Sequence, residues 1–192
     1  MPGAEEKTGN HEGETSMTNR AMRLGAAMAL CAGAAFAQDA EESTNRVAAK
    51  TDWSVFVESD PQECWGVSAP KEQVNTRDGN VVAVRRGDAL LFVAYRPADE
   101  VTGEVSFTGG YPFAPNSTVS MDISGKSFEL FTEGEWAWPA SPEDDAAILE
   151  AMRAGADAVL TARSARGTQT QDTFSLLGFT AALEEASSRC GG

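Results

Sequence analysis

AMRAGADAVLTARSARGTQTQDTFSLLGFTAAL, residues 151–183, contains the signals that decide the fold. Gly155 closes a helical segment, because glycine is the residue that most often follows the last turn of a helix. Residues 156–163 then read as a strand, residues 166–171 as a turn with a polar return, and residues 172–177 as a second strand. Another helix follows. Short strands joined by a tight turn, with a helix on either side, predict an antiparallel β-rich domain.

Two helices are predicted, and both have clear sequence signals. SPEDDAAILEAMRAG, residues 141–155, has Ser141 at the N-cap and Pro142 at the first helical position. Its first turn is acidic, which favours the positive end of the helix dipole. FTAALEEASSRC, residues 179–190, has one apolar stripe at helical spacing. The stripe consists of Phe179, Ala182, Leu183, Ala186 and Cys190. We therefore expect Cys190 on the buried side of the C-terminal helix.

The residues between 51 and 140 read as short strands separated by turns. Trp53, Val55 and Val57 alternate with polar residues, which is typical of a half-buried strand. VVAVRRGDALLFVAYR, residues 81–96, reads as a hairpin whose tip is Arg86-Gly87-Asp88. The predicted fold class is therefore mainly β. We expect an antiparallel β-sandwich-like domain with one inserted helix and one C-terminal helix.

The N-terminus has the pattern of a secretory signal peptide. Two arginines precede the apolar run LGAAMALCAGAAFA, residues 24–37, which ends in an A-x-A cleavage site. The run is too short to span a bilayer. We expect residues 1–37 to be an N-terminal extension and a cleaved signal peptide, residues 38–50 a flexible leader, and residues 51–192 the β-rich domain.

The charge of the chain narrows its possible partners, and its cysteine content indicates a disulfide. Cleavage after Ala37 leaves 155 residues with 25 acidic and 12 basic side chains, a net charge of −13. Such a surface disfavours nucleic acid, whose binding depends on lysine and arginine. No transmembrane segment is expected in the mature chain. Cys64 and Cys190 are the cysteines that remain. We expect them to form a disulfide rather than a reactive thiol pair, since the chain is exported and has no C-x-x-C motif.

Five short motifs point to one family of proteins. They are Trp53-Ser54-Val55, Glu63-Cys64-Trp65, Met152-Arg153-Ala154-Gly155, Arg166-Gly167-Thr168 and Ser175-Leu176-Leu177-Gly178-Phe179. Together they resemble the invasion-associated locus B family of exported alphaproteobacterial proteins, and the resemblance spans nearly all of the expected mature chain. These motifs are turns, caps and core positions. The resemblance therefore implies a fold and an envelope or secreted protein, and it supplies no catalytic residues.

Trp136 and Trp138 are candidate binding residues in TEGEWAWPAS, residues 132–141. Side chains two positions apart on a strand share a face, so both indoles should project to one side, with Glu133 and Glu135 on the other. The favoured interpretation is core packing beneath the following helix. The alternative is a platform on which a sugar ring stacks. We expect Trp138, at the end of the strand, to be the more exposed of the two.

GGYPFAP, residues 109–115, is a second candidate contact region, because it places Tyr111 and Phe113 on a loop rich in glycine and proline. Loops lie at the surface, so these aromatic side chains are candidates for contact with a ligand or a partner. The alternative is a loop held over the end of the domain by its own aromatic side chains.

No catalytic residue set, metal or cofactor is expected. A serine or cysteine nucleophile usually depends on a histidine, and the only histidine, His11, precedes the cleavage site. A zinc site is not expected either, because two cysteines without a histidine cannot supply a usual set of zinc ligands. The acidic residues 143–145 lack the spacing of a calcium-binding loop. The remaining enzymatic alternative is a hydrolase that uses Glu133 and Glu135 as paired carboxylates.

Taken together, these features predict an exported, soluble, non-catalytic envelope or secreted protein that acts by protein or cell-surface interaction. The expected location is the periplasm or the medium. A carbohydrate-binding module that uses Trp136 and Trp138 is the alternative function, with a surface glycan as the partner. Arg86-Gly87-Asp88 spells an integrin-type tripeptide, but glycine and aspartate are also ordinary turn formers.

The processing pattern can be tested by intact-mass analysis of the protein from fractionated cells. We expect the processed form to begin at Gln38, and the precursor to begin at Met17 or Met22 because the preceding residues are polar and acidic. A precursor that retains residue 1, or a cellular form that is never shortened, would contradict this expectation.

Overall fold

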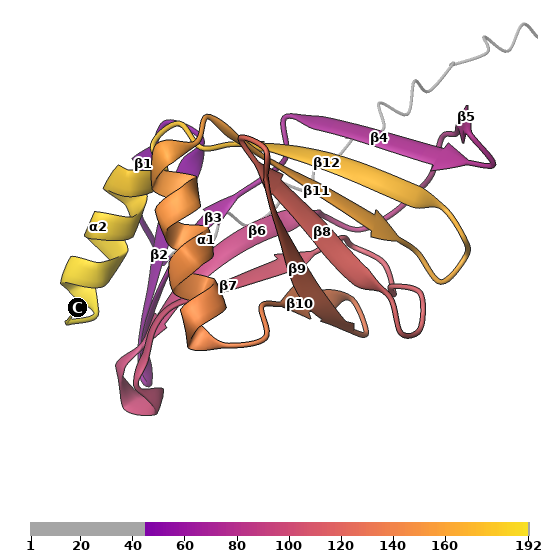
Figure 1. The fold of residues 1–192 in the computed structure, drawn as a ribbon. Helices are drawn as coiled ribbons and strands as arrows, with labels where there is room; N and C mark the ends of the chain where they lie inside the picture. Colours follow the sequence, from indigo (N-terminus) through magenta and orange to yellow (C-terminus); the bar gives the residue numbers. More distant parts are fainter. Residues whose placement is uncertain (1–44, 192) are drawn as a thin grey trace, which may run out of the picture. The chain divides into compact units, whose positions relative to one another are not determined.

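The computed structural model describes residues 45–191, and the predicted signal peptide lies outside them. The described part is mainly β, with two α-helices (Figure 1). The strands are β1 (Arg46–Lys50), β2 (Trp53–Ser59), β3 (Gln62–Ser68), β4 (Glu72–Arg77), β5 (Asn80–Val81), β6 (Leu90–Arg96), β7 (Val101–Thr108), β8 (Thr118–Ile123), β9 (Lys126–Glu133), β10 (Trp136–Trp138), β11 (Asp157–Arg163) and β12 (Gln169–Ser175). The helices are α1 (Pro142–Ala154), α2 (Phe179–Arg189) and the short 3₁₀ turn η1 (Pro97–Asp99).

All twelve strands form one antiparallel sheet in the order β1-β2-β3-β6-β7-β10-β9-β8-β11-β12-β4-β5. This confirms the predicted mainly-β fold with one inserted and one C-terminal helix, and the sheet is a single open one. The sheet curls so that distant strands face each other. The ring of Phe107 on β7 lies 6.0 Å from that of Phe174 on β12, and the Trp53 indole on β2 donates to the Ser175 carbonyl oxygen at 3.0 Å. The core lies inside this curl.

Alternation along each strand decides which side chains enter the core. On β8, Val119, Met121 and Ile123 are fully buried and their neighbours are not, as the sequence predicts. The same alternation buries Leu91 and Val93 on β6. A strand therefore has an inner face toward the core and an outer face, and directly paired residues on neighbouring strands share the same face.

Helix α1 joins β10 to β11 and begins as predicted. The Ser141 hydroxyl accepts a hydrogen bond from the Asp144 amide at 3.2 Å, and Pro142 takes the first helical position. Asp145 then accepts a hydrogen bond from the Val105 amide on β7 at 2.8 Å. Burial raises the pKa of the Asp145 carboxyl, while the hydrogen bond from Val105 opposes that rise. These contacts hold the first turn of α1 against β7.

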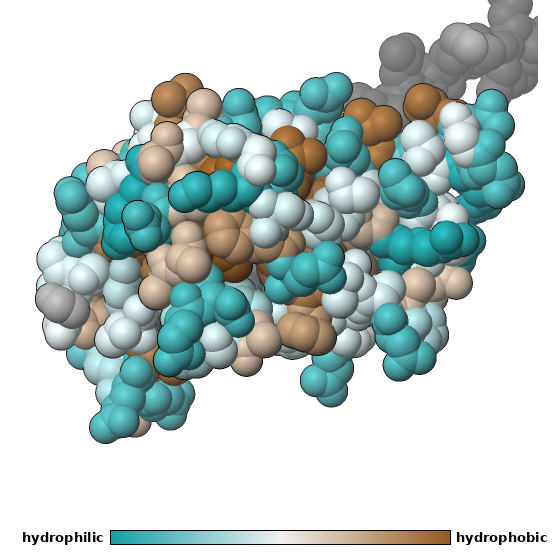
Figure 2. All heavy atoms as spheres, in the orientation of Figure 1, coloured by the Kyte–Doolittle hydropathy of each residue, from teal (hydrophilic) through white to brown (hydrophobic). Residues whose placement is uncertain are grey.

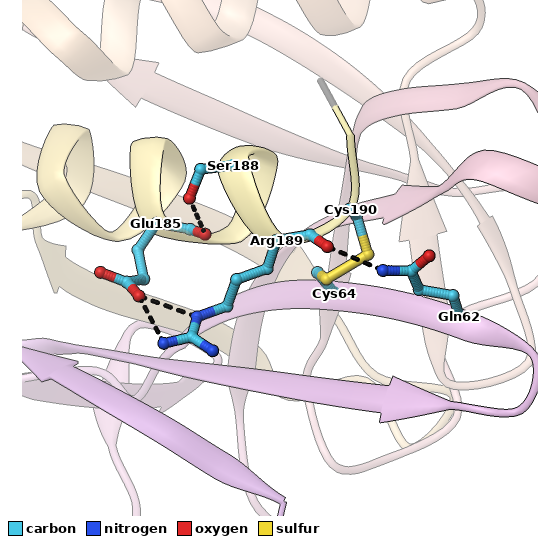
Figure 3. The surroundings of a disulfide bond; sticks show 6 residues. All are labelled: Gln62, Cys64, Glu185, Ser188, Arg189 and Cys190. Atoms are coloured by element: carbon cyan, nitrogen blue, oxygen red, sulfur yellow. Dashed lines mark hydrogen bonds and ion pairs between the residues drawn. A yellow bond between two sulfur atoms is a disulfide. The ribbon is translucent and has the colours of Figure 1, made fainter.

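Helix α2 covers β2 and β3 (Figure 1) with the predicted apolar stripe buried. Its end is tied to β3 by the predicted Cys64–Cys190 disulfide, whose Cα atoms are 5.9 Å apart (Figure 3). Next to it, the Gln62 side-chain amide donates to the Arg189 carbonyl oxygen at 2.7 Å. The N-cap of α2 is Gly178, with φ 89°, and a Cβ there would meet the Lys50 carbonyl oxygen at 1.9 Å. Only glycine fits this contact between α2 and β1.

Two expectations are corrected by the structure. Residues 46–50, expected in the flexible leader, form β1 and pair with β2, so the domain begins before residue 51. Residues 81–96 form no hairpin. Val81 belongs to β5, which pairs with β4, whereas residues 90–96 form β6 between β3 and β7, and residues 82–89 between them form neither helix nor strand. The two apolar runs are adjacent in sequence, but they pair with different strands of the sheet.

Polar and apolar side chains share the surface on the side that carries the helices. In Figure 2 the apolar residues on that side appear as separate patches among polar ones. Among residues 45–191, no helix has the length and apolar character needed to cross a membrane.

The disulfide should contribute measurably to stability, because it joins residues 126 positions apart and so restricts the unfolded chain. We expect reduction to lower the free energy of unfolding by about 2–5 kcal/mol, measured by urea denaturation with and without a phosphine reductant. As a control, a Cys64→Ala/Cys190→Ala variant should not respond to the reductant. An unchanged unfolding midpoint on reduction of the unmodified protein would contradict this role.

Candidate functional site

The two tryptophans of β10 lie on the outer face of the sheet. Ala137 between them is fully buried, whereas Trp136 is 39% exposed and Trp138 is half-buried. Their rings stack at 21° with centroids 6.4 Å apart. The prediction that they share a face is confirmed, but core packing is wrong for Trp136. The expected order of exposure is also reversed, because Trp138 pairs with Phe131 of β9 whereas Trp136 stands next to the β9–β10 turn.

The glutamates beside them do not take the predicted positions. The strand ends at Glu133, and Gly134 and Glu135 form a turn. Glu133 pairs directly with Trp136, so it shares the outer face with the tryptophan instead of lying opposite to it. The two carboxylates therefore belong to different parts of a hairpin.

Trp136 and Trp138 are part of a larger aromatic surface, which we call the aromatic face. It consists of the outward-facing aromatic residues Phe56, Trp65, Phe92, Phe131, Trp136 and Trp138. Phe56 stacks on Trp65 with centroids 6.1 Å apart, and Phe92 contacts Trp136 at 5.5 Å. The residues of the aromatic face thus come from five strands of the sheet.

Strand β7 crosses the middle of the aromatic face and bears only small outer side chains there. Ser106 pairs with Phe92 on one side, and Thr108 pairs with Trp136 on the other. Both are buried although they lie on the outer face, at 9% and 8% exposure. The large rings on the neighbouring strands account for this burial. Phe131, at 56% exposure, continues the apolar surface on β9. A surface of partly exposed aromatic rings on neighbouring strands is typical of an interaction site.

The two aromatic side chains of the loop of residues 109–115 lie in different environments. Phe113 is buried against Phe107, with ring centroids 6.0 Å apart, and its segment forms a bridge to Ser164. Phe113 is therefore a core residue, and the predicted contact role is wrong for it because the loop folds inward. Tyr111 is half-buried, and its hydroxyl lies 2.5 Å from the Thr170 hydroxyl. It lines a surface cavity beside the loop.

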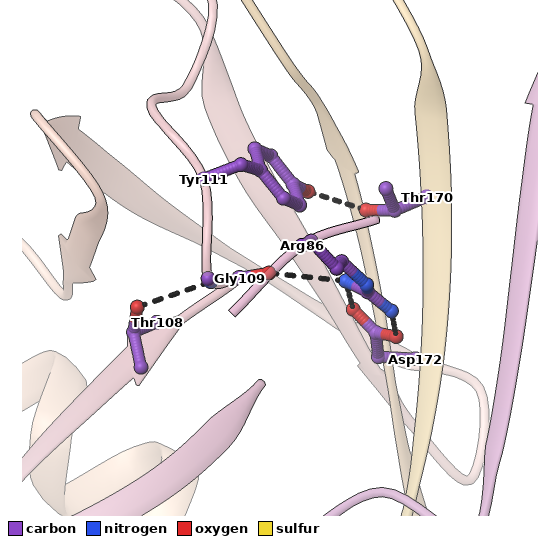
Figure 4. Close-up of polar contacts among 7 residues, drawn as sticks. Arg86, Thr108, Gly109, Tyr111, Thr170 and Asp172 are labelled. Carbon is purple, nitrogen blue, oxygen red and sulfur yellow. Dashed lines mark hydrogen bonds and ion pairs between the residues drawn. The ribbon is translucent and has the colours of Figure 1, made fainter. Parts of the chain in front are cut away.

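Below Tyr111 lies a buried ion pair that the sequence did not reveal (Figure 4). The Arg86 guanidinium binds both carboxylate oxygens of Asp172 on β12, and it also donates to the Gly109 carbonyl oxygen at 3.2 Å. The side chains of Arg86 and Asp172 are 7% and 0% exposed. The Tyr111 ring covers the guanidinium, with its centroid 5.7 Å from Arg86 Cζ. Three segments far apart in sequence meet at this point.

Burial and charge act in opposite directions on Arg86. Burial alone would lower the pKa of the guanidinium, but the hydrogen bonds and charge of Asp172 raise it overall. The pKa of Tyr111 is raised as well, mainly because burial disfavours the charged phenolate. At neutral pH the Arg86 guanidinium is therefore charged beneath a neutral Tyr111.

Gly87, the residue after Arg86, also contacts the loop of residues 109–115. Its amide donates to the Gly110 carbonyl oxygen at 2.9 Å, and a Cβ on Gly110, which has φ 71°, would meet the Gly87 carbonyl oxygen at 2.3 Å. The tripeptide Arg86-Gly87-Asp88 therefore begins with a buried arginine and a glycine packed against another loop. It is not the tip of a hairpin, and its arginine is not available to a receptor.

Residues 45–191 include no histidine, and no group of three or more metal-ligating side chains gathers among them. The aromatic face includes Phe56, Trp65, Phe92 and Phe131 in addition to the predicted tryptophans. Their signal was present in the sequence, because each alternates with residues that enter the core.

Comparisons with known proteins agree with the resemblance in the sequence. The profile of the invasion associated locus B protein family matches residues 53–187. The fold is similar to that in the crystal structure of invasion associated protein B from Bartonella henselae, with a TM-score of 0.51 and 18% sequence identity over 73% of this chain and 95% of that chain. A search of curated proteins finds no match.

The buried ion pair can be tested by removing one of its charges. We expect Asp172→Asn to lower the free energy of unfolding by about 3–5 kcal/mol, because Arg86 then stays buried without a charged partner. The measurement is urea denaturation, with Asp157→Asn on β11 as the matched control, since Asp157 is exposed. Equal, small effects of both substitutions would contradict the role given to the pair.

Proposed function

Since the chain belongs to the invasion associated locus B family, we propose that it is an exported, non-catalytic protein that binds a partner protein through its aromatic face. The single observation that carries this proposal is the exposed aromatic surface on the outer side of the sheet. The partner belongs to the cell envelope or to a surface that the secreted protein meets.

Export is supported by two independent features. Residues 24–37 have the pattern of a signal-peptide core, and the pairing of Cys64 with Cys190 suits an oxidising compartment. The periplasm and the medium are both such compartments.

A protein partner is supported by the composition and layout of the aromatic face. Tryptophan is among the residues most enriched where binding energy is concentrated, and aromatic side chains are common at the centre of interfaces. Residues from five strands of a hydrogen-bonded sheet also hold their positions before a partner arrives. Such a surface loses little conformational freedom on binding.

A carbohydrate partner is the alternative, and the stacked pair of Trp136 and Trp138 favours it. A sugar platform needs a free ring face, however, and here one indole stacks on the other at 21° while Phe92 contacts Trp136 from β6. Much of the ring surface is thus used within the protein. The hydrolase alternative has less support, because Glu133 and Glu135 lie on a strand and in a turn of one hairpin.

Site-specific photo-crosslinking in the producing cells tests the proposal. We expect a photoreactive phenylalanine analogue in place of Phe131 to form one discrete adduct with another protein, because this side chain is 56% exposed on the aromatic face. The matched control position is Leu177, which is 62% exposed and lies outside the aromatic face. Adding Trp136→Ser should abolish the adduct formed at position 131.

Two results would contradict the proposal. The first is an identical set of adducts from positions 131 and 177, which would indicate contact by proximity alone. The second is saturable binding of the purified protein to a glycan array that is lost in the Trp136→Ser variant while no protein adduct forms. That outcome would make the partner a carbohydrate.

A further inference from the structure

A cavity of about 370 Å³ opens beside the buried ion pair and differs in charge from the rest of the chain. Its walls come mainly from residues 84–86, residues 110–112 of the glycine-rich loop and the turn between β11 and β12, and Arg77, Glu135 and Thr170 complete them. Four arginines line it: Arg77, Arg85, Arg86 and Arg166. The chain as a whole has a net charge of −14, so this grouping of arginines is unusual for it.

Three of these arginines have no carboxylate partner among the described residues. Arg86 is neutralised by Asp172, whereas Arg77 donates to the Thr168 hydroxyl at 2.7 Å. Arg85 and Arg166 make no ion pair within residues 45–191, and both are exposed. Glu135 is the one acidic residue that lines the cavity. The cavity therefore holds an excess of positive charge.

The positions of these arginines depend on the packed base of the cavity. Arg85 is next in sequence to Arg86, which is fixed on Asp172, and Arg77 is fixed by Thr168 at the far side of the β11–β12 turn. Holding like charges together is unfavourable in the empty protein, and an anion placed between them relieves the repulsion. The guanidinium group also has the donor geometry that matches carboxylate and phosphate oxygens.

The remaining walls indicate the size and nature of the ligand. Val84, Pro112 and Ala165 provide apolar surface, and Tyr111 provides an aromatic ring. The volume lies at the lower end of the range of small-molecule pockets, about 300–1,000 Å³. None of the residues of the aromatic face lines the cavity, so this site is independent of the proposed protein contact.

We propose that this cavity binds a small organic anion, whose carboxylate or phosphate oxygens lie between Arg77, Arg85 and Arg166 and whose carbon skeleton contacts Val84, Pro112 and Tyr111. The protein then has two binding functions, one for a partner protein and one for a small acidic molecule.

Isothermal titration calorimetry of the full chain in low-salt buffer tests this site. The probes are citrate as the carboxylate, glucose 6-phosphate as the organic phosphate, inorganic phosphate as the phosphate without a skeleton, and glucose as the neutral control. We expect saturable binding of citrate or glucose 6-phosphate, weaker binding of inorganic phosphate and none of glucose. Whichever of the first two binds more tightly identifies the acidic group.

Substitutions separate a specific site from general attraction. We expect Arg85→Gln/Arg166→Gln to weaken binding of the preferred anion about tenfold or more, since each lost arginine removes a charge-assisted hydrogen bond. Arg166→Gln alone should weaken it by a smaller factor. Arg153→Gln, on the exposed side of α1 and outside the cavity, is the matched control and should leave affinity unchanged. Because Arg85 and Arg166 are exposed, the variants should keep the circular dichroism spectrum of the unmodified protein.

The proposal is overturned if none of the three anions binds, or if the double variant and Arg153→Gln bind the anion as tightly as the unmodified protein. It is also overturned if glucose binds as well as glucose 6-phosphate, because the cavity would then select for the sugar and not for the charge.

Discussion

The ion pair between Arg86 and Asp172 is the interaction on which the rest of this half of the molecule depends. It links residues 82–89, which have no secondary structure of their own, to β12 near one edge of the sheet. Removing two charges from water is costly, so such a pair is maintained only when its geometry and its further hydrogen bonds are good. Here the Gly109 carbonyl oxygen and the Tyr111 ring complete the surroundings of the guanidinium. One contact thus fixes a connecting segment, a glycine-rich loop and a strand, and these form most of the cavity wall.

Strand alternation explains how the same sheet provides both a core and an outward-facing aromatic surface. On β6 the inner positions Leu91 and Val93 pack in the curl, and Phe92 between them faces outward. On β10 the inner position is Ala137, and the two tryptophans face outward. The aromatic face therefore forms because large aromatic residues occupy the outward-facing positions of strands whose side chains alternate between two faces. On the inner side of β2 and β3, the disulfide and α2 stabilise the sheet.

Local signals predicted much of this fold. Ser141 and Pro142 marked the start of α1, the stripe that ends at Cys190 marked the buried side of α2, and Val119, Met121 and Ile123 marked an inner face. The features that were not predicted correctly from the sequence depend on pairing between residues far apart in the chain. Whether an apolar strand after Val81 pairs with its neighbour or with β3 and β7 is decided by strands elsewhere in the chain, and the contact between Arg86 and Asp172 joins residues 86 positions apart. Burial of Trp136 likewise depended on which face of β10 the core covers, and alternation alone does not settle this.

The central claim is that the buried pair holds an arginine-lined site without itself taking part in binding. Side-chain NMR of the arginine guanidinium groups in the full chain, recorded while citrate is added, tests this most directly. The account predicts that the Arg86 resonance exchanges slowly with water and does not move, while those of Arg85 and Arg166 shift and saturate together. A rapidly exchanging Arg86, or equal and unsaturated shifts of all exposed arginines, would contradict it.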